Sequence, residues 1–97
     1  MKGARQTRIV ATLGPATETE ETIGGLMDAG ANLFRLNMSH ARHNWVRRVV
    51  EQIRVAAAAR DYVPGIVMDL QGPSIRTGEI PASVMLVKGD RFDFTID

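Results

Sequence analysis

Two clusters of polar residues, each at the end of a short apolar run, carry the side chains that could do chemistry in this sequence. The first cluster occupies residues 35–40 and the second occupies residues 69–76. In parallel α/β sheets and barrels, ligands bind at the carboxyl ends of the strands. If both runs are strands of such a sheet, the two clusters lie on the same rim, and we expect the binding site there.

Arg35 is a charged residue in the otherwise apolar run 31–37. A buried charge without a partner is costly, and the planar guanidinium suits a carboxylate or a phosphate, which it can bind through two N–H groups. The residue types leave three partners open for Arg35. These are a bound anion, an internal salt bridge to Asp69, and solvent at an edge strand.

Asn37, Ser39 and Asp69 offer oxygen atoms at two neighbouring strand ends. Oxygen ligands suit a hard cation such as K⁺ or Mg²⁺ rather than zinc. The same residue types commonly bond to nearby backbone groups in turns, and spacing alone favours this capping role. Both roles stay open at this point.

His40 and Arg76 each have a functional and a structural interpretation. His40 and His43 are followed by no cysteine or carboxylate at the spacing of a zinc site, so we expect both on a helix surface. After the rigid turn at Gly72-Pro73, Arg76 is either a phosphate ligand or an exposed loop residue. The sequence contains no glycine-rich phosphate loop of the P-loop or dinucleotide type.

The elements that must position these residues are short strands separated by helices. Apolar runs at residues 9–13, 31–37 and 66–70 are predicted to be strands. The segments between them are long enough for crossover helices. The resulting β-α-β-α-β order predicts an α/β fold with a parallel sheet.

Helices are predicted in both connections. Residues 17–21 offer hydroxyl caps and carboxylates for the start of the first helix, and Gly30 is a suitable stop. Gly24-Gly25 in its interior costs about 1 kcal/mol for each glycine relative to alanine. The second helix is expected over about residues 40–60. Its apolar stripe consists of Val46, Val49, Val50, Ile53 and Ala57.

The pattern changes after Gly72-Pro73, where helical periodicity gives way to β-type runs. Residues 84–87 and 92–96 flank the glycine-containing segment 88–91, an arrangement typical of a β-hairpin. We therefore place a subdomain boundary near residues 78–81.

Composition excludes several classes of protein. The 97 residues include 12 lysines and arginines against 11 acids, a net charge of +1 that argues against a general nucleic-acid or acidic-membrane binder. The absence of cysteine excludes a disulfide scaffold and thiolate metal sites, and it is compatible with the cytoplasm, where we expect the protein to act. The apolar run 9–13 is too short for a secretory signal or a membrane span.

Three blocks of this sequence together resemble the N-terminal part of the pyruvate kinase family. They are residues 7–15 (TRIVATLGP), 28–40 (DAGANLFRLNMSH) and 68–78 (MDLQGPSIRTG), in the expected order and spacing. The resemblance implies a phosphotransferase that converts phosphoenolpyruvate and ADP to pyruvate and ATP in glycolysis. It also implies the first three strands and two helices of a (β/α)8 barrel over residues 1–76. Residues 77–97 would then form the opening hairpin of an inserted β-barrel lid domain.

The resemblance also implies roles for single residues. Arg35 would contact the transferring phosphoryl group. Asn37, Ser39, Asp69 and the backbone carbonyl of Leu70 match the positions that bind a monovalent cation. Arg76 and the segment from Asn37 through Ser39 to His40 match positions that touch nucleotide phosphates.

Two departures limit what is carried over from the family. Ser74 replaces the glutamate associated with K⁺ dependence, so a K⁺ requirement does not follow. The family's Mg²⁺-binding acids and catalytic lysine lie on segments that this sequence does not contain. We therefore expect the chain alone to be inactive, although the complete enzyme, a homotetramer by the same likeness, would bind phosphoenolpyruvate and ADP or ATP. The alternative is a non-catalytic truncated product that acts at most as an anion- or partner-binding module.

Overall fold

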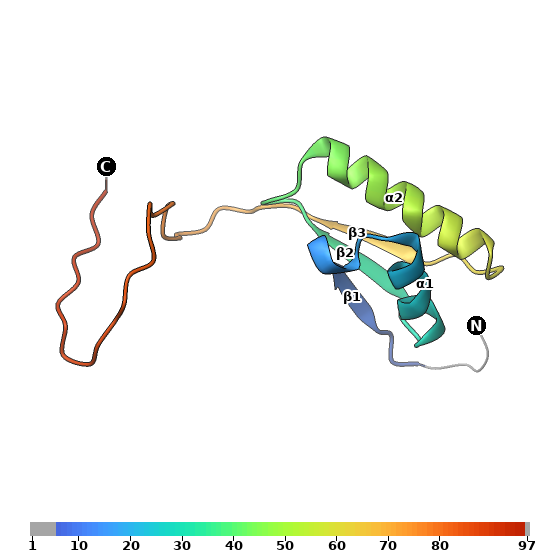
Figure 1. Cartoon of the computed structure of the whole chain (residues 1–97), viewed down its shortest axis with the longest axis horizontal. Helices are drawn as coiled ribbons and strands as arrows, with labels where there is room; N and C mark the ends of the chain where they lie inside the picture. Colours follow the sequence, from blue (N-terminus) through green and yellow to red (C-terminus); the bar gives the residue numbers. More distant parts are fainter. Residues whose placement is uncertain (1–5, 97) are drawn as a thin grey trace.

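The computed structural model describes residues 6–96 and contains three parallel strands that alternate with two α-helices. Strands β1 (Val10–Leu13), β2 (Leu33–Asn37) and β3 (Gly65–Asp69) lie in that order in one sheet (Figure 1). Helices α1 (Glu20–Asp28) and α2 (His43–Ala58) connect them, and a short 3-10 turn, η1 (Pro15–Thr17), follows β1. The predicted β-α-β-α-β order and parallel pairing are therefore confirmed.

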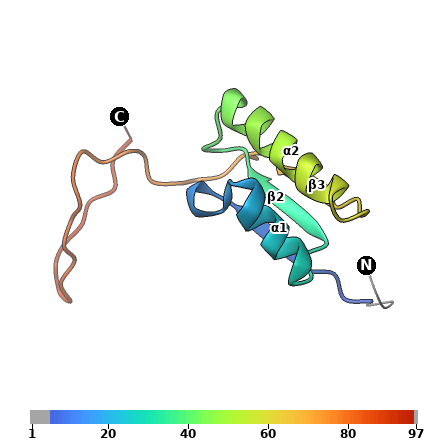
Figure 2. The same ribbon diagram turned by 45° about the vertical axis from the view of Figure 1, so that its right-hand side comes forward.

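Both helices cover the same face of the sheet, as Figure 2 shows. Because side chains alternate along a strand, every second residue points toward the helices, and Phe34 and Leu36 of β2 are completely buried there. The opposite face is open. On that face Thr12 lies beside Arg35, and Asn37 lies beside Asp69.

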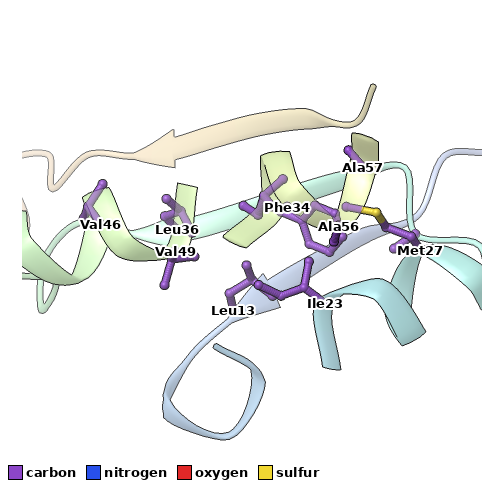
Figure 3. Packing of buried hydrophobic residues seen from close by; sticks show 11 residues of the cluster. Leu13, Ile23, Met27, Phe34, Leu36, Val46, Val49, Ala56 and Ala57 are labelled. Carbon is purple, nitrogen blue, oxygen red and sulfur yellow. The ribbon is translucent and has the colours of Figure 1, made fainter. Parts of the chain in front are cut away.

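The core lies between β2 and the two helices (Figure 3). The predicted stripe of α2 faces it: Val46, Val49, Ile53 and Ala57 are buried, and Val50 is half-buried. Ile23 and Met27 complete the core from α1, with Leu13 from β1. Helix α2 is amphipathic as predicted, and its arginines stay on the outer side.

Helix α1 begins and ends at predicted residues. Thr19 is its N-cap, and the hydroxyl oxygen of Thr19 accepts a hydrogen bond of 3.2 Å from the backbone N–H of Thr22. Gly30 adopts a φ of +114°, a left-handed conformation that favours glycine just after a helix.

Gly24 leaves room for the side chain of Arg60, which lies two residues beyond the end of α2, and the sequence pattern does not reveal this contact. Arg60 forms a bidentate ion pair with Asp28, with Nε to Oδ1 at 2.8 Å and Nη2 to Oδ2 at 3.0 Å. A Cβ at Gly24 would lie only 2.5 Å from Arg60 Nη2 and 2.7 Å from its Cζ. The bond from Arg60 holds the pKa of the Asp28 carboxyl below its usual value, so the pair stabilises the fold at neutral pH and loses this effect as the pH falls through that lowered pKa.

The two glycines of α1 are expected to respond differently to alanine. At Gly25 no neighbouring atom lies within 4 Å of an added Cβ, so Gly25→Ala should raise the free energy of unfolding by about 0.5–1 kcal/mol through helix propensity. Gly24→Ala should gain less, because the methyl group displaces Arg60 from Asp28. In an Arg60→Ala background the two substitutions should give the same gain. Urea unfolding of the four variants measures this, and equal gains in the wild-type background would contradict it.

The segment 70–96 differs from the prediction. The structure shows no helix or strand in these residues, which leave the carboxyl end of β3 and run away from the sheet (Figure 1). The predicted turn is present: Asp90 N–H donates to the Val87 carbonyl at 3.0 Å, and Gly89 has a φ of +96°. The predicted hairpin pairing is not shown. A two-stranded ribbon is marginal unless its apolar face is covered, and Phe94 and Ile96 are fully exposed here.

Candidate functional site

The candidate site lies on the open face at the carboxyl ends of the strands. The register places Asn37 directly opposite Asp69, and Met38 N–H donates to the Asp69 carbonyl at 3.1 Å, which extends the pairing by one residue beyond β2. Arg35 lies two residues before Asn37 and points to the same face. The structure thus brings Arg35, Asn37 and Asp69 together on one face.

Arg35 is held by an internal salt bridge, which is one of the three partners that the sequence left open. Its Nε donates to Asp69 Oδ2 at 2.8 Å, and its Nη2 contacts the same oxygen. Its Nη1 lies 3.4 Å from Thr12 Oγ1. Among the described residues these contacts use three of the five N–H groups of the guanidinium. A second anion can therefore approach the remaining Nη hydrogens while Asp69 holds Arg35 in place.

Asn37 and Ser39 form a turn, so the structure shows the capping role that their spacing favoured. Asn37 Oδ1 accepts hydrogen bonds from the Ser39 backbone N–H at 3.2 Å and from Ser39 Oγ at 2.5 Å. This pair fixes the chain where it leaves β2. These two bonds use both lone pairs of the Asn37 amide oxygen, whereas the Ser39 hydroxyl oxygen keeps its own. An ion bound to the Asn37 oxygen would therefore replace one of the two bonds.

The other predicted residues lie outside this cluster. His43 is exposed at the start of α2, as expected, whereas His40 is exposed in the turn before that helix and not on the helix surface predicted for it. Leu70 is exposed just after β3, and Arg76 is exposed in the segment that leaves the sheet. Within the described part of the chain, no hydrogen bond or ion pair joins Arg76 to Arg35, Asn37 or Asp69.

Thr12 and Glu18 are contacts that sequence reasoning missed. Thr12 is polar at the carboxyl end of β1 and lies opposite Arg35, so its type and position were a usable signal. Glu18 Oε2 accepts a hydrogen bond of 2.7 Å from Trp45 Nε1 and lies 3.8 Å from Arg48 Nη2. Trp45 is half-buried and packs against the core, and no sequence signal pairs it with Glu18.

The structure adds two observations on classes of site. Residues 6–96 contain no group of three histidine, cysteine or acidic side chains placed to hold a metal ion. In the same range, no helix has the length and apolar character that crossing a membrane requires.

Known proteins match this chain in both sequence and structure. The family described as "Pyruvate kinase, barrel domain" matches residues 4–97. The chain is 40% identical over 94 residues to plastidial pyruvate kinase 2 of Arabidopsis thaliana, covering 96% of this chain and 16% of that protein. It is 44% identical over 94 residues to pyruvate kinase 2 of Synechocystis sp., covering 94% of this chain and 16% of that protein.

A solved pyruvate kinase of Cryptosporidium parvum in complex with ADP has the same arrangement, with a TM-score of 0.68 and 39% identity over 72% of this chain and 14% of that chain. The chain thus spans about a sixth of the length of the curated relatives it matches. Because the family match runs through nearly the whole sequence and the parallel strands and helices superpose on a solved member, this chain belongs to the pyruvate kinase family and corresponds to the N-terminal portion of its barrel domain.

Proposed function

We propose that this chain supplies part of the active site of a pyruvate kinase that transfers the phosphoryl group of phosphoenolpyruvate to ADP. The observation that carries the proposal is the placement of Arg35, Asn37 and Asp69 on one face, at the carboxyl ends of two adjacent parallel strands. Ligands of parallel barrels bind at this rim. The family membership of the chain supports the same reaction.

Arg35 is the residue we assign to the transferring phosphoryl group. The salt bridge with Asp69 and the contact with Thr12 orient the guanidinium before any substrate arrives. A positioned cation stabilises the negative charge of a phosphoryl group in transfer without reorganising at the moment of reaction. The free Nη hydrogens are the groups that would make this contact.

The oxygen atoms beside Arg35 are suited to a monovalent cation. Asn37 and Asp69 are opposite each other on neighbouring strands, about 4.8 Å apart in the pairing direction, so oxygens from both can reach one ion. Ser39 and the carbonyl of Leu70 lie next to them in the chain. When bound, such an ion balances substrate charge. Ser74 stands where the family has the glutamate associated with K⁺ dependence. We therefore propose that this cation site does not strictly require K⁺.

The other assignments rest on the family likeness. We propose that His40 and Arg76 contact nucleotide phosphates once the complete lid and barrel are in place. Residues 1–76 would then belong to the barrel and residues 77–97 to the lid. Mg²⁺, which offsets phosphate charge when bound, would be held by segments absent from this sequence. A homotetramer is the assembly we propose for the complete enzyme, and the cytoplasm stays our prediction. The relatives include a plastidial enzyme of Arabidopsis and an enzyme of Synechocystis.

A chimeric enzyme tests this function. Residues 1–97 would replace the matching segment of Synechocystis pyruvate kinase 2, to which this chain is 44% identical. We expect the chimera to form pyruvate from phosphoenolpyruvate and ADP in a coupled assay, and the isolated chain to show no turnover above background. A chimera that unfolds cooperatively but is inactive would favour the non-catalytic alternative. Turnover by the isolated chain would contradict the assignment of the missing lysine and acids to other segments.

A further inference from the structure

Asn32 is buried at the amino ends of the three strands. The candidate site lies at the opposite, carboxyl ends of the same strands. The exposed fraction of Asn32 is 5%. Among the residues that the structure describes, no other buried residue has a polar side chain. A buried amide is costly unless it is hydrogen-bonded. Asn32 precedes β2 directly, so its partners affect where that strand meets its neighbours.

The hydrogen bonds of Asn32 join it to both neighbouring strands. Its Oδ1 accepts from the Ile9 N–H at 2.9 Å, and its own backbone N–H donates to the Ile9 carbonyl at 2.9 Å. On the other side, its carbonyl accepts from the Gly65 N–H at 3.1 Å. Asn32 is therefore bonded to Ile9, directly before β1, and to Gly65, the first residue of β3.

These bonds lie next to the first paired residues of the sheet, where Val10, Leu33 and Gly65 are level with one another. A slip of one residue in a parallel pair would move every side chain of the slipped strand to the other face. A slip of β1 would take Thr12 off the face that carries Arg35, and a slip of β3 would take Asp69 off it. The side-chain bond to Ile9 is available in one register of β1 only, because it pairs one amide with one backbone N–H.

Gly65 reinforces the same register from the third strand. A Cβ at this position would lie 3.0 Å from Leu33 Cδ2 and 3.2 Å from its Cγ, so Leu33 packs directly over the glycine. A shift of one residue would place Pro64 or Ile66 opposite Leu33, where neither side chain has this space. The two contacts thus select one register across all three strands.

We propose that the Asn32 side chain is a positioning group for the candidate site: it fixes the register of β1 against β2 and so sets Thr12 beside Arg35, while Gly65 under Leu33 fixes β3. The importance of those residues rests on the proposed phosphotransferase function. The positioning itself is measured without any turnover. A failure of the function test would therefore leave this proposal untouched, and the reverse also holds.

Nuclear magnetic resonance of the isolated chain tests the proposal, with an osmolyte added to favour the compact state. In the wild-type chain the Ile9 amide, which lies outside β1, should exchange with water as slowly as the amides of the strands, because Asn32 holds it. The Arg35 Nε–H should give a slowly exchanging signal, since it is held by Asp69. Exchange of the Ile9 amide as fast as the amides of the segment 70–96 would overturn the proposal.

Two variants of similar size separate register from general stability. Asn32→Leu removes the acceptor and should remove the nuclear Overhauser contact between the Thr12 and Arg35 side chains, which depends on the register of β1. Asn32→Asp keeps an oxygen in place and should retain that contact, even at lower stability. The Arg35 Nε–H signal depends on β2 and β3 and should persist in both variants. Asn44→Leu, at an exposed position of α2, is the control and should change neither signal. A folded Asn32→Leu chain that keeps the contact between Thr12 and Arg35, or an Asn32→Asp chain that loses it, would refute the positioning role. If Asn32→Leu does not fold, Asn32→Asp and the Ile9 amide decide the question.

Discussion

Arg35→Lys in the chimeric enzyme is expected to lower kcat for pyruvate formation by about 10²–10³-fold, the usual effect of removing one positioned donor from a charged transition state. The planar guanidinium uses Nε and Nη2 for Asp69 and keeps other N–H groups for a substrate anion. A lysine ammonium is a point charge on a flexible stem, so it does not hold Asp69 and the phosphoryl group in the same way. Steady-state kinetics with varied phosphoenolpyruvate measures the effect.

Arg47→Lys is the matched control, because Arg47 is exposed on the outer side of α2 and belongs to no contact of the site. It should leave kcat and KM unchanged. The loss at Arg35 should fall mainly on kcat, because the contact strengthens as charge develops on the phosphoryl group. An Arg35→Lys enzyme with the kcat of the parent chimera would remove Arg35 from the reaction, and a rise in KM alone would reduce its role to substrate binding.

Phe34→Ala is expected to lower the free energy of unfolding of the chain by about 3–5 kcal/mol. Phe34 is completely buried between β2 and the helices, where it is the largest fully buried side chain (Figure 3). Truncating a buried phenylalanine costs about 3–5 kcal/mol, and a domain of this size has about 5–15 kcal/mol in total. Urea unfolding followed by the fluorescence of Trp45, the single tryptophan, measures the change.

Phe94→Ala provides the control for that experiment with the same chemical change. Phe94 is 86% exposed in the segment beyond β3, so its truncation removes no core contact. Its effect on the free energy of unfolding should stay within about 0.5 kcal/mol. If both variants destabilise the chain equally, Phe94 is packed in solution and the segment 70–96 is folded against the sheet. If Phe34→Ala keeps a wild-type transition, the core is not where the structure places it.

Most of the secondary structure could be predicted from the sequence because its signals are local. The apolar stripe of α2, the Thr19 cap and the Gly30 stop each depend on residues within one or two helical turns. The hairpin expected after residue 81 also has local signals, and its turn is present. Its pairing is not shown, because two such strands need an apolar cover that lies outside the local pattern.

The site could be predicted as a set of residues but not as a set of contacts. Strand-end position was enough to select Arg35, Asn37 and Asp69. The choice between a bound anion and Asp69 as the partner of Arg35 depends on strand register, which a sequence pattern does not contain. Asn32 could not be predicted for the same reason, since an asparagine soon after Gly30 is typical of an ordinary turn. From the sequence, Gly24 is predicted only to destabilise the helix. The side chain that needs the space, Arg60, is distant in the chain.

The Arg35–Asp69 pair has a consequence for the order in which such an enzyme can assemble. The partners that the structure gives to Arg35 are Thr12 of β1 and Asp69 of β3. The charges of Arg35 and Asp69 can therefore pair as soon as strands β1 to β3 are present, without any strand that is synthesised later. Domains form from the N-terminal side as the chain leaves the ribosome. The ion pair of the candidate site can therefore form while most of a complete barrel is still untranslated.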